Sequence, residues 1–127
     1  MKKYAFLAAM VAASITAGHA QAAALVGNVS NGHAVFEQTC HLCHSLDHNK
    51  IGPVLDGVYG RKAGTAAGFN YSPGVKSSKI VWNDETLDKW LSGPSQLIPG
   101  ARMTIRVTDP QKRADVIAYL KSLGAKK

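Results

Sequence analysis

The feature that most constrains this chain is the pentapeptide Cys40-His41-Leu42-Cys43-His44, which holds both of its cysteines. A Cys-x-x-Cys pair serves three chemistries: a redox-active disulfide, half of a zinc site, or the two thioether bonds of a c-type haem. The adjacent histidine favours the haem. Two sulfurs about one helical turn apart reach the two vinyl carbons of a porphyrin, and His44 then supplies a nitrogen to the iron.

The other two chemistries make demands that the rest of the sequence meets less well. Zinc needs a second pair of closely spaced ligands, and His33, His41 and His48 form no such pair. A thioredoxin-like motif needs a preceding strand inside a βαβ pattern, and the sequence predicts neither. A simple disulfide between Cys40 and Cys43 remains the alternative to a haem.

Residues 1–22 have the pattern of a secretory signal peptide. Residues 1–3 are a positively charged start, residues 4–17 are almost wholly apolar, and small residues follow at the spacing that a signal peptidase reads. We place cleavage after Ala22, to within two residues, so that residues 23–127 form one mature domain in the periplasm. The apolar run is shorter than the roughly 20 residues that span a bilayer, which argues against stable membrane insertion.

Composition bounds the mature domain to one small globule. The chain has 127 residues, 46% of them hydrophobic, and its formal charge of +7 falls to +5 when Lys2 and Lys3 leave with the leader. These values exclude a fibre, a coiled coil and a multi-domain enzyme. A domain of about 100 residues buries only roughly two thirds of its unfolded surface, so a cofactor would add cohesion.

If a haem is bound, the group on the far side of its iron decides the function. An open position indicates ligand binding or catalysis, and a filled one indicates electron transfer. Met103 is the only methionine of the mature chain, on a segment whose prolines and glycines exclude a regular helix. A lone methionine is ordinarily core filler, but a thioether on a stiffened loop far from His44 fits a distal ligand. His48 lies only four residues after His44 and would stay on the proximal side.

Periodicity and capping residues predict an all-α fold with three main helices joined by Gly-rich connections and short helical turns. Gly32 inside the first helix predicts a close backbone approach by the last one. We expect helices at residues 31–44, residues 83–92 and residues 110–124 and a short turn at residues 72–73, with a loop at residues 93–104.

From Gly32 onward the chain resembles the class I cytochromes c, namely mitochondrial cytochrome c and its small bacterial periplasmic relatives. The likeness is far more specific than the pentapeptide alone, because it extends over almost the whole mature chain. The matching segments are residues 32–36, 40–44, 52–55, 60–64, 68–72, Trp82, 98–103 and 117–120.

This resemblance implies a cytochrome c fold wrapped around one covalent haem c, and a role as a one-electron carrier rather than an enzyme. It implies that Cys40 and Cys43 carry the haem, that His44 and Met103 ligate the iron, and that the Pro53 carbonyl supports the His44 ring. The residues it places around the haem propionates are Arg61, Tyr71 and Trp82. It also implies a soluble monomer that shuttles electrons between a quinol-oxidising membrane complex and an oxidase, reaction centre or peroxidase.

The positive charge fits docking on membrane redox complexes with acidic surfaces, by fast and salt-sensitive association. It is scattered rather than clustered with aromatic residues, which argues against nucleic acid. The lysines expected on the solvated face are Lys50, Lys76, Lys79, Lys89, Lys112, Lys126 and Lys127.

Some positions depart from the family pattern. Thr39, Ser95 and Gln96 stand where mitochondrial relatives tend to have lysines, which thins the basic docking surface. Trp90 replaces the tyrosine usual behind the methionine, and we expect that change to remove a hydrogen bond from the distal pocket. The rival functions are a haem enzyme or ligand sensor whose Met103 dissociates readily, and a colourless thiol oxidoreductase.

Overall fold

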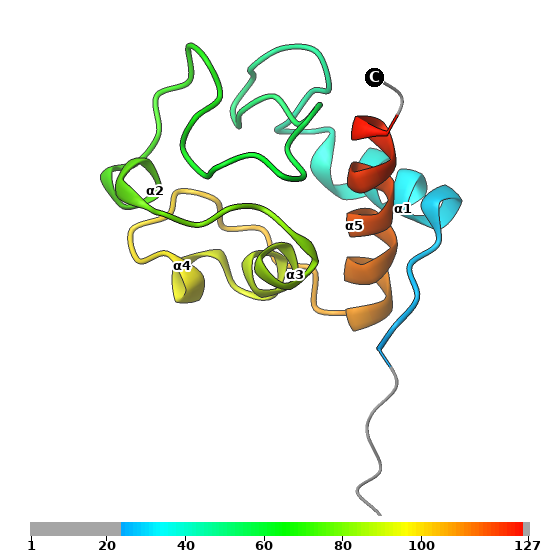
Figure 1. Cartoon of the computed structure of the whole chain (residues 1–127). Helices are drawn as coiled ribbons and strands as arrows, with labels where there is room; N and C mark the ends of the chain where they lie inside the picture. Colours follow the sequence, from blue (N-terminus) through cyan, green and yellow to red (C-terminus); the bar gives the residue numbers. More distant parts are fainter. Residues whose placement is uncertain (1–23, 126–127) are drawn as a thin grey trace, which may run out of the picture.

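Two helices from opposite ends of the sequence, α1 (Val29–Val35) and α5 (Pro110–Gly124), pack against each other on one side of the molecule (Figure 1). Phe36 and Val116 are fully buried at this junction, with Ile117 and Leu120 beside them. The expected role of Gly32 is confirmed, because a Cβ atom there would overlap the backbone carbonyl oxygen of Asp115. Absence of a side chain therefore sets how closely the two helices approach.

The structure is a computed structural model that describes residues 24–125, so the expected leader and the last two lysines lie outside the described residues. Its remaining elements, which lie opposite the α1–α5 junction, are short helices joined by long connections (Figure 1). They are α2 (Pro73–Ser77), α3 (Asp84–Ser92) and α4 (Pro94–Leu97). Within the described residues the only β pairing is an isolated bridge between Lys62 and Val81, so the predicted all-α class is confirmed.

The first helix differs from the prediction of residues 31–44. It begins at Val29, with the Asn28 side chain accepting a hydrogen bond from the Asn31 N–H at 2.9 Å. After α1 the backbone widens into a π-helical segment, η1 (Phe36–Cys40), and leaves the helix at His41. Beyond η1 the Cys43 N–H donates to the Cys40 oxygen at 3.1 Å, and the Cys43 oxygen accepts from the Gly52 N–H at 2.8 Å instead of from a further helical turn.

The other two main helices follow their capping residues. Asn83 and Thr86 cap α3 reciprocally, and the Asp109 carboxylate accepts from the first turn of α5. The segment predicted as a loop at residues 93–104 contains one short helix, α4, because Pro94 suits a first helical position and the chain can turn once before Pro99.

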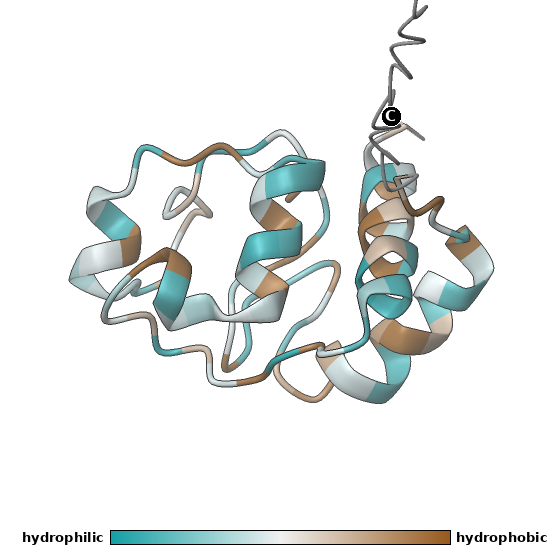
Figure 2. Cartoon of the chain, turned by 90° about the horizontal axis from the view of Figure 1, so that it is seen from below, coloured by the Kyte–Doolittle hydropathy of each residue, from teal (hydrophilic) through white to brown (hydrophobic). Residues whose placement is uncertain are grey.

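Each helix carries both hydrophilic and hydrophobic residues (Figure 2), as expected for helices with one buried face. Among the described helices none combines the length and the apolar character that a membrane crossing requires.

Candidate cofactor pocket

A cavity of about 540 Å³ lies between the α1–α5 junction and the loops and short helices opposite. Its volume is in the range of small-molecule and cofactor sites, and its walls are mainly apolar. Among its lining residues the only charged ones are the two arginines, Arg61 and Arg102. The cavity therefore suits a large, mainly apolar group that carries some negative charge.

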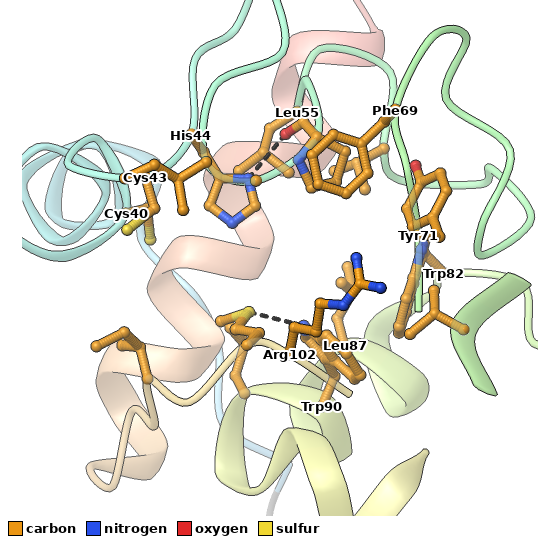
Figure 3. A pocket seen from close by; sticks show the side chains of 18 of the residues that line it. Cys40, Cys43, His44, Leu55, Phe69, Tyr71, Trp82, Leu87, Trp90 and Arg102 are labelled. Carbon is orange, nitrogen blue, oxygen red and sulfur yellow. Dashed lines mark hydrogen bonds between the residues drawn. The ribbon is translucent and has the colours of Figure 1, made fainter. Parts of the chain in front are cut away.

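Cys40 and Cys43 lie together on one wall (Figure 3), half-buried and not joined by a disulfide. Burial, and then the neighbouring Cys43, raise the pKa of Cys40 to about 11. A thiol with so high a pKa is a poor nucleophile in disulfide exchange, which argues against a thiol oxidoreductase. Residues 24–125 contain no group of three or more His, Cys, Asp and Glu residues placed to hold a metal ion.

The His44 ring points into the cavity beside these cysteines (Figure 3). Its Nδ1 donates a hydrogen bond to the Pro53 carbonyl oxygen at 2.8 Å, so Nε2 carries the free lone pair. Burial lowers the pKa of His44, the bond to Pro53 opposes that shift, and Lys50 adds to it. A Cβ atom on Gly52 would overlap this ring. The glycine thus leaves room for a neutral, oriented imidazole.

Met103 lines the same cavity, half-buried, and its sulfur accepts a hydrogen bond from Nε1 of Trp90 at 3.2 Å, drawn as a dashed line in Figure 3. The expectation that Trp90 removes a hydrogen bond from this side is therefore wrong, because the indole supplies an N–H donor of its own. His48 does not line this cavity; it is exposed and bonded to Asp47 at 2.6 Å.

Tyr71 and Trp82 lie on the side of the cavity opposite the cysteines (Figure 3). The Tyr71 hydroxyl accepts from the Ala66 N–H at 3.0 Å, and Trp82 is buried. Arg61, which also lines the cavity, donates to the Val54 carbonyl oxygen at 2.8 Å. The structure thus brings every residue of the predicted site to one cavity.

Arg102 is a cavity residue that the sequence reasoning missed. Its guanidinium donates to the Asn70 carbonyl oxygen at 3.0 Å and points into the cavity (Figure 3). Its position next to Met103 was the signal that could have revealed it. The exposed residues that line the cavity include two apolar ones, Ile51 and Ile105, which are 78% and 45% exposed, beside the polar Asn70, Arg102 and Thr104.

These residues fit a haem. The cavity offers one imidazole nitrogen, one thioether sulfur, two thiols on one wall and two guanidinium groups for carboxylates. Iron in haem takes nitrogen and thioether ligands, and the thiols of a Cys-x-x-Cys-His motif can form thioethers with its vinyl groups.

Comparisons with known proteins agree with this chemistry. A family model described as cytochrome c matches residues 29–124. Cytochrome c2 of Blastochloris viridis is 41% identical over 129 residues, which cover 98% of this chain and 96% of the relative. Cytochrome c of Sesamum indicum is 40% identical over 103 residues, which cover 78% of this chain and 93% of the relative.

Solved structures give the same result. The structure of cytochrome cH from Methylobacterium extorquens matches with a TM-score of 0.72 and 39% sequence identity, over 76% of this chain and 99% of that one. Ferricytochrome c2 of Rhodopseudomonas palustris matches with a TM-score of 0.69 and the same identity, over 76% and 98%. These matches confirm the predicted fold.

Proposed function

The chain belongs to the cytochrome c family, whose members are electron-transfer proteins that bear a covalent haem c rather than enzymes, and we propose that its haem is held by Cys40 and Cys43 and ligated by His44 and Met103. We propose further that it is a soluble periplasmic monomer that carries one electron at a time. When bound, the haem supplies an iron that takes up and releases a single electron.

One observation carries this proposal: an oriented imidazole and a thioether line the same cavity as a pair of half-buried thiols. If His44 and Met103 both hold the iron, a substrate would find no free ligand position there, which favours electron transfer over catalysis. The apolar lining disfavours additional positive charge, and a thioether is a soft ligand. Both therefore favour the reduced state. Arg61 and Arg102 would compensate the carboxylates of the bound group.

The covalent attachment is tested on the purified protein. A pyridine haemochrome spectrum after denaturation should show a c-type haem, and a proteolytic peptide spanning residues 40–44 should carry the mass of one haem. A colourless protein with free or disulfide-linked Cys40 and Cys43 would contradict the proposal.

The ligands are tested by substitution. Met103→Ala should leave the haem attached, open the iron to carbon monoxide and lower the reduction potential, because a soft ligand that favours reduced iron is lost. His44→Ala should impair formation of the holoprotein. A Met103→Ala protein that keeps the potential of the parent and does not bind carbon monoxide would refute the distal assignment. Rapid cyanide binding by the unaltered protein at neutral pH would favour the ligand-sensor alternative.

We propose that exposed lysines near the cavity guide docking on acidic partners. Lys50 adjoins the cavity residue Ile51, and Lys76 follows the cavity residue Val75; both lysines are exposed. Lys89 is less available, because it is paired with Glu85 at 2.6 Å. A Lys50→Glu/Lys76→Glu variant should slow electron transfer to an acidic partner and flatten its dependence on ionic strength.

Lys79→Glu, compared with Lys50→Glu alone, is the matched control, because it makes the same charge change at an exposed lysine whose sequence neighbours Ser78 and Ile80 do not line this cavity. We expect its effect on the rate to be much smaller. Equal slowing by the two variants would show that net charge, rather than a local surface, governs association.

Export is proposed from the signal-like pattern of residues 1–22. N-terminal sequencing of the protein from a periplasmic fraction should start within two residues of Ala23. A chain recovered with Met1 in the membrane fraction would contradict export as a soluble protein.

A further inference from the structure

We propose that Arg113 is a positioning residue for the distal ligand. Its guanidinium joins α5 to α3 and to the end of the segment that carries Met103, and it thereby limits how often that segment moves away from the cavity. This inference rests on the proposed function in one respect, namely that Met103 is the distal ligand of the iron.

The guanidinium of Arg113 makes hydrogen bonds to two other parts of the chain. Its Nε donates to the Asp88 carboxylate of α3 at 2.7 Å. Its Nη1 donates to the carbonyl oxygens of Val107 at 2.9 Å and Thr108 at 3.1 Å. The Arg113 side chain is only 13% exposed, whereas that of Asp88 is 49% exposed. Shielding from water on the arginine side makes these charge-assisted bonds stronger than they would be on an open surface.

The segment between α4 and α5 (Figure 1) depends on this anchor, because its own backbone is sparsely bonded. In the part of the chain that the structure describes, residues 102–106 make no backbone-to-backbone hydrogen bond, and their hydrogen bonds are those of side chains. The next backbone bond runs from the Val107 N–H to the Leu91 oxygen at 2.8 Å. A segment with so few bonds opens more easily than a helix does, so the groups that hold its end govern its opening.

Val107 is the point at which that end is held. It is buried, it lines the cavity, and it lies four residues after Met103. Its N–H is bonded to Leu91 of α3 and its oxygen to Arg113 of α5, and the same guanidinium holds α3 through Asp88. Loss of the guanidinium would release the Val107 oxygen and separate α3 from α5 at this point. The Met103 side of the cavity could then open without unfolding the α1–α5 junction.

The shape of the arginine side chain is needed for this arrangement. A guanidinium is a planar fork with five N–H donors, and here two of its nitrogens serve acceptors on different segments. A lysine carries the same charge, but all of its donors are on one nitrogen, so it does not reproduce the fork. Arg113→Lys therefore keeps the net charge and removes the positioning.

The test is imidazole binding by the ferric holoprotein of the parent, Arg113→Lys and Asp88→Asn. Imidazole takes the place of Met103 on the iron, so its affinity reports how readily the segment opens. The weak far-red band of the sulfur-to-iron bond reports the closed state. Arg113→Lys should tighten imidazole binding roughly tenfold to a hundredfold, the effect of one lost charge-assisted hydrogen bond. Asp88→Asn should act less, because an amide oxygen still accepts from Nε.

Hydrogen exchange locates the opening. The Val107 amide should exchange faster in Arg113→Lys than in the parent by a similar factor, while the amides of α1 that face α5 keep their protection. Equal acceleration in Val107 and in α1 would show that Arg113 stabilises the whole fold rather than this segment, and it would overturn the proposal.

Phe36→Leu is the control for general loosening, since Phe36 is fully buried at the α1–α5 junction and does not line the cavity. It should lower the free energy of unfolding but leave the imidazole affinity within about twofold of the parent. An equal change in imidazole affinity in Phe36→Leu and Arg113→Lys would refute the positioning role. Should Arg113→Lys not fold, Asp88→Asn decides, because it must tighten imidazole binding more than Phe36→Leu does.

The far-red band of the parent separates this inference from the proposed function. If the unaltered ferric protein shows the band and Arg113→Lys changes neither band nor imidazole affinity, the positioning role is wrong and the ligand assignment stands. A parent protein without the band refutes the ligand assignment and this inference together.

Discussion

The α1–α5 junction and the wall of the cavity opposite it are built in different ways. At the junction, apolar side chains of the two helices fill the space between them, and Gly32 allows the backbones to touch. The cavity wall consists of short helices and connections held by backbone and side-chain hydrogen bonds, and its apolar residues face a space of about 540 Å³. At the junction the two helix faces fill the space between them, whereas the wall leaves a space for a group that the polypeptide does not supply.

This difference assigns separate roles to the two regions. Where side chains interdigitate, adding or removing a single methylene lowers the stability of the folded protein. A wall that packs on a cofactor depends instead on that cofactor, because a group that binds only the folded chain shifts the unfolding equilibrium. Changes at the junction should therefore affect the whole fold, and changes at the wall should affect the bound group first.

The largest effect is expected when the attachment is lost. A Cys40→Ala/Cys43→Ala chain should lose more than about 4 kcal/mol of unfolding free energy, since no cofactor then stabilises the wall. Hydrogen exchange should become fast in the connections at residues 45–72 and 98–107 while α1 and α5 keep more of their protection. Uniform loss of protection across both regions would contradict the division.

A substitution at the junction should come next. Gly32→Ala places a Cβ atom against the Asp115 carbonyl oxygen and should lower the free energy of unfolding by about 3 kcal/mol, as overpacking does. Gly124→Ala is the control, because a Cβ atom there meets no other atom within 4 Å. Chemical denaturation of the two variants measures the difference, and equal stabilities would show that the helices can move apart at little cost.

A glycine of the wall should behave differently. Gly52→Ala would push against the His44 ring and disturb its hydrogen bond to Pro53. We expect a loss of stability of only about 1 kcal/mol, because the new Cβ atom meets the end of a side chain rather than backbone, but a raised reduction potential, since the hydrogen bond to Pro53 increases the basicity of the ligand. A redox titration measures the potential, and chemical denaturation measures the stability. An unchanged potential, together with a loss of unfolding free energy as large as that of Gly32→Ala, would show that the two regions do not differ in this way.

The smallest effect concerns a contact that joins the two regions. Lys121 of α5 lies 3.4 Å from the Asp84 carboxylate and over the Tyr59 ring. The Tyr59 hydroxyl and Asp84 raise the pKa of Lys121 above its usual value of 10.5. Its contribution to stability is therefore complete below pH 10.5 and is lost as the pH rises through the higher folded-state pKa.

Lys121→Met tests that contact. The variant should be slightly less stable than the parent at neutral pH, as expected for an exposed ion pair, and the difference should vanish at strongly alkaline pH. Thermal melts at both pH values measure it. A difference that is constant with pH would mean that packing of the side chain, rather than its charge, makes the contact.

The sequence predicted the parts of the molecule that depend on local or motif-level signals. Caps at Asn83 and Asp109 are read within one helical turn, and the α3 and α5 boundaries followed from them. The first helix was misplaced because its start and end depend on distant groups. The Asn28 N–H donates to the buried Asp115 carboxylate at 2.8 Å, and the Gly52 N–H takes the carbonyl oxygen of Cys43.

The cavity residues show the same limit. Cys40, Cys43 and His44 are adjacent in the sequence, so their chemistry was evident from spacing. Arg102 was missed, and the hydrogen bond that Trp90 donates was misjudged. Whether a side chain turns into a cavity depends on how two separate segments of the chain meet.

The central claim is that a haem fills this cavity with the Met103 sulfur on its iron. It is tested most directly by the absorption spectrum of the purified ferric protein at neutral pH, compared with that of Met103→Ala. We predict a c-type haem spectrum in both and a weak far-red band from the sulfur-to-iron bond that only the unaltered protein shows. A band that persists in Met103→Ala, or is absent from both proteins, would contradict the claim.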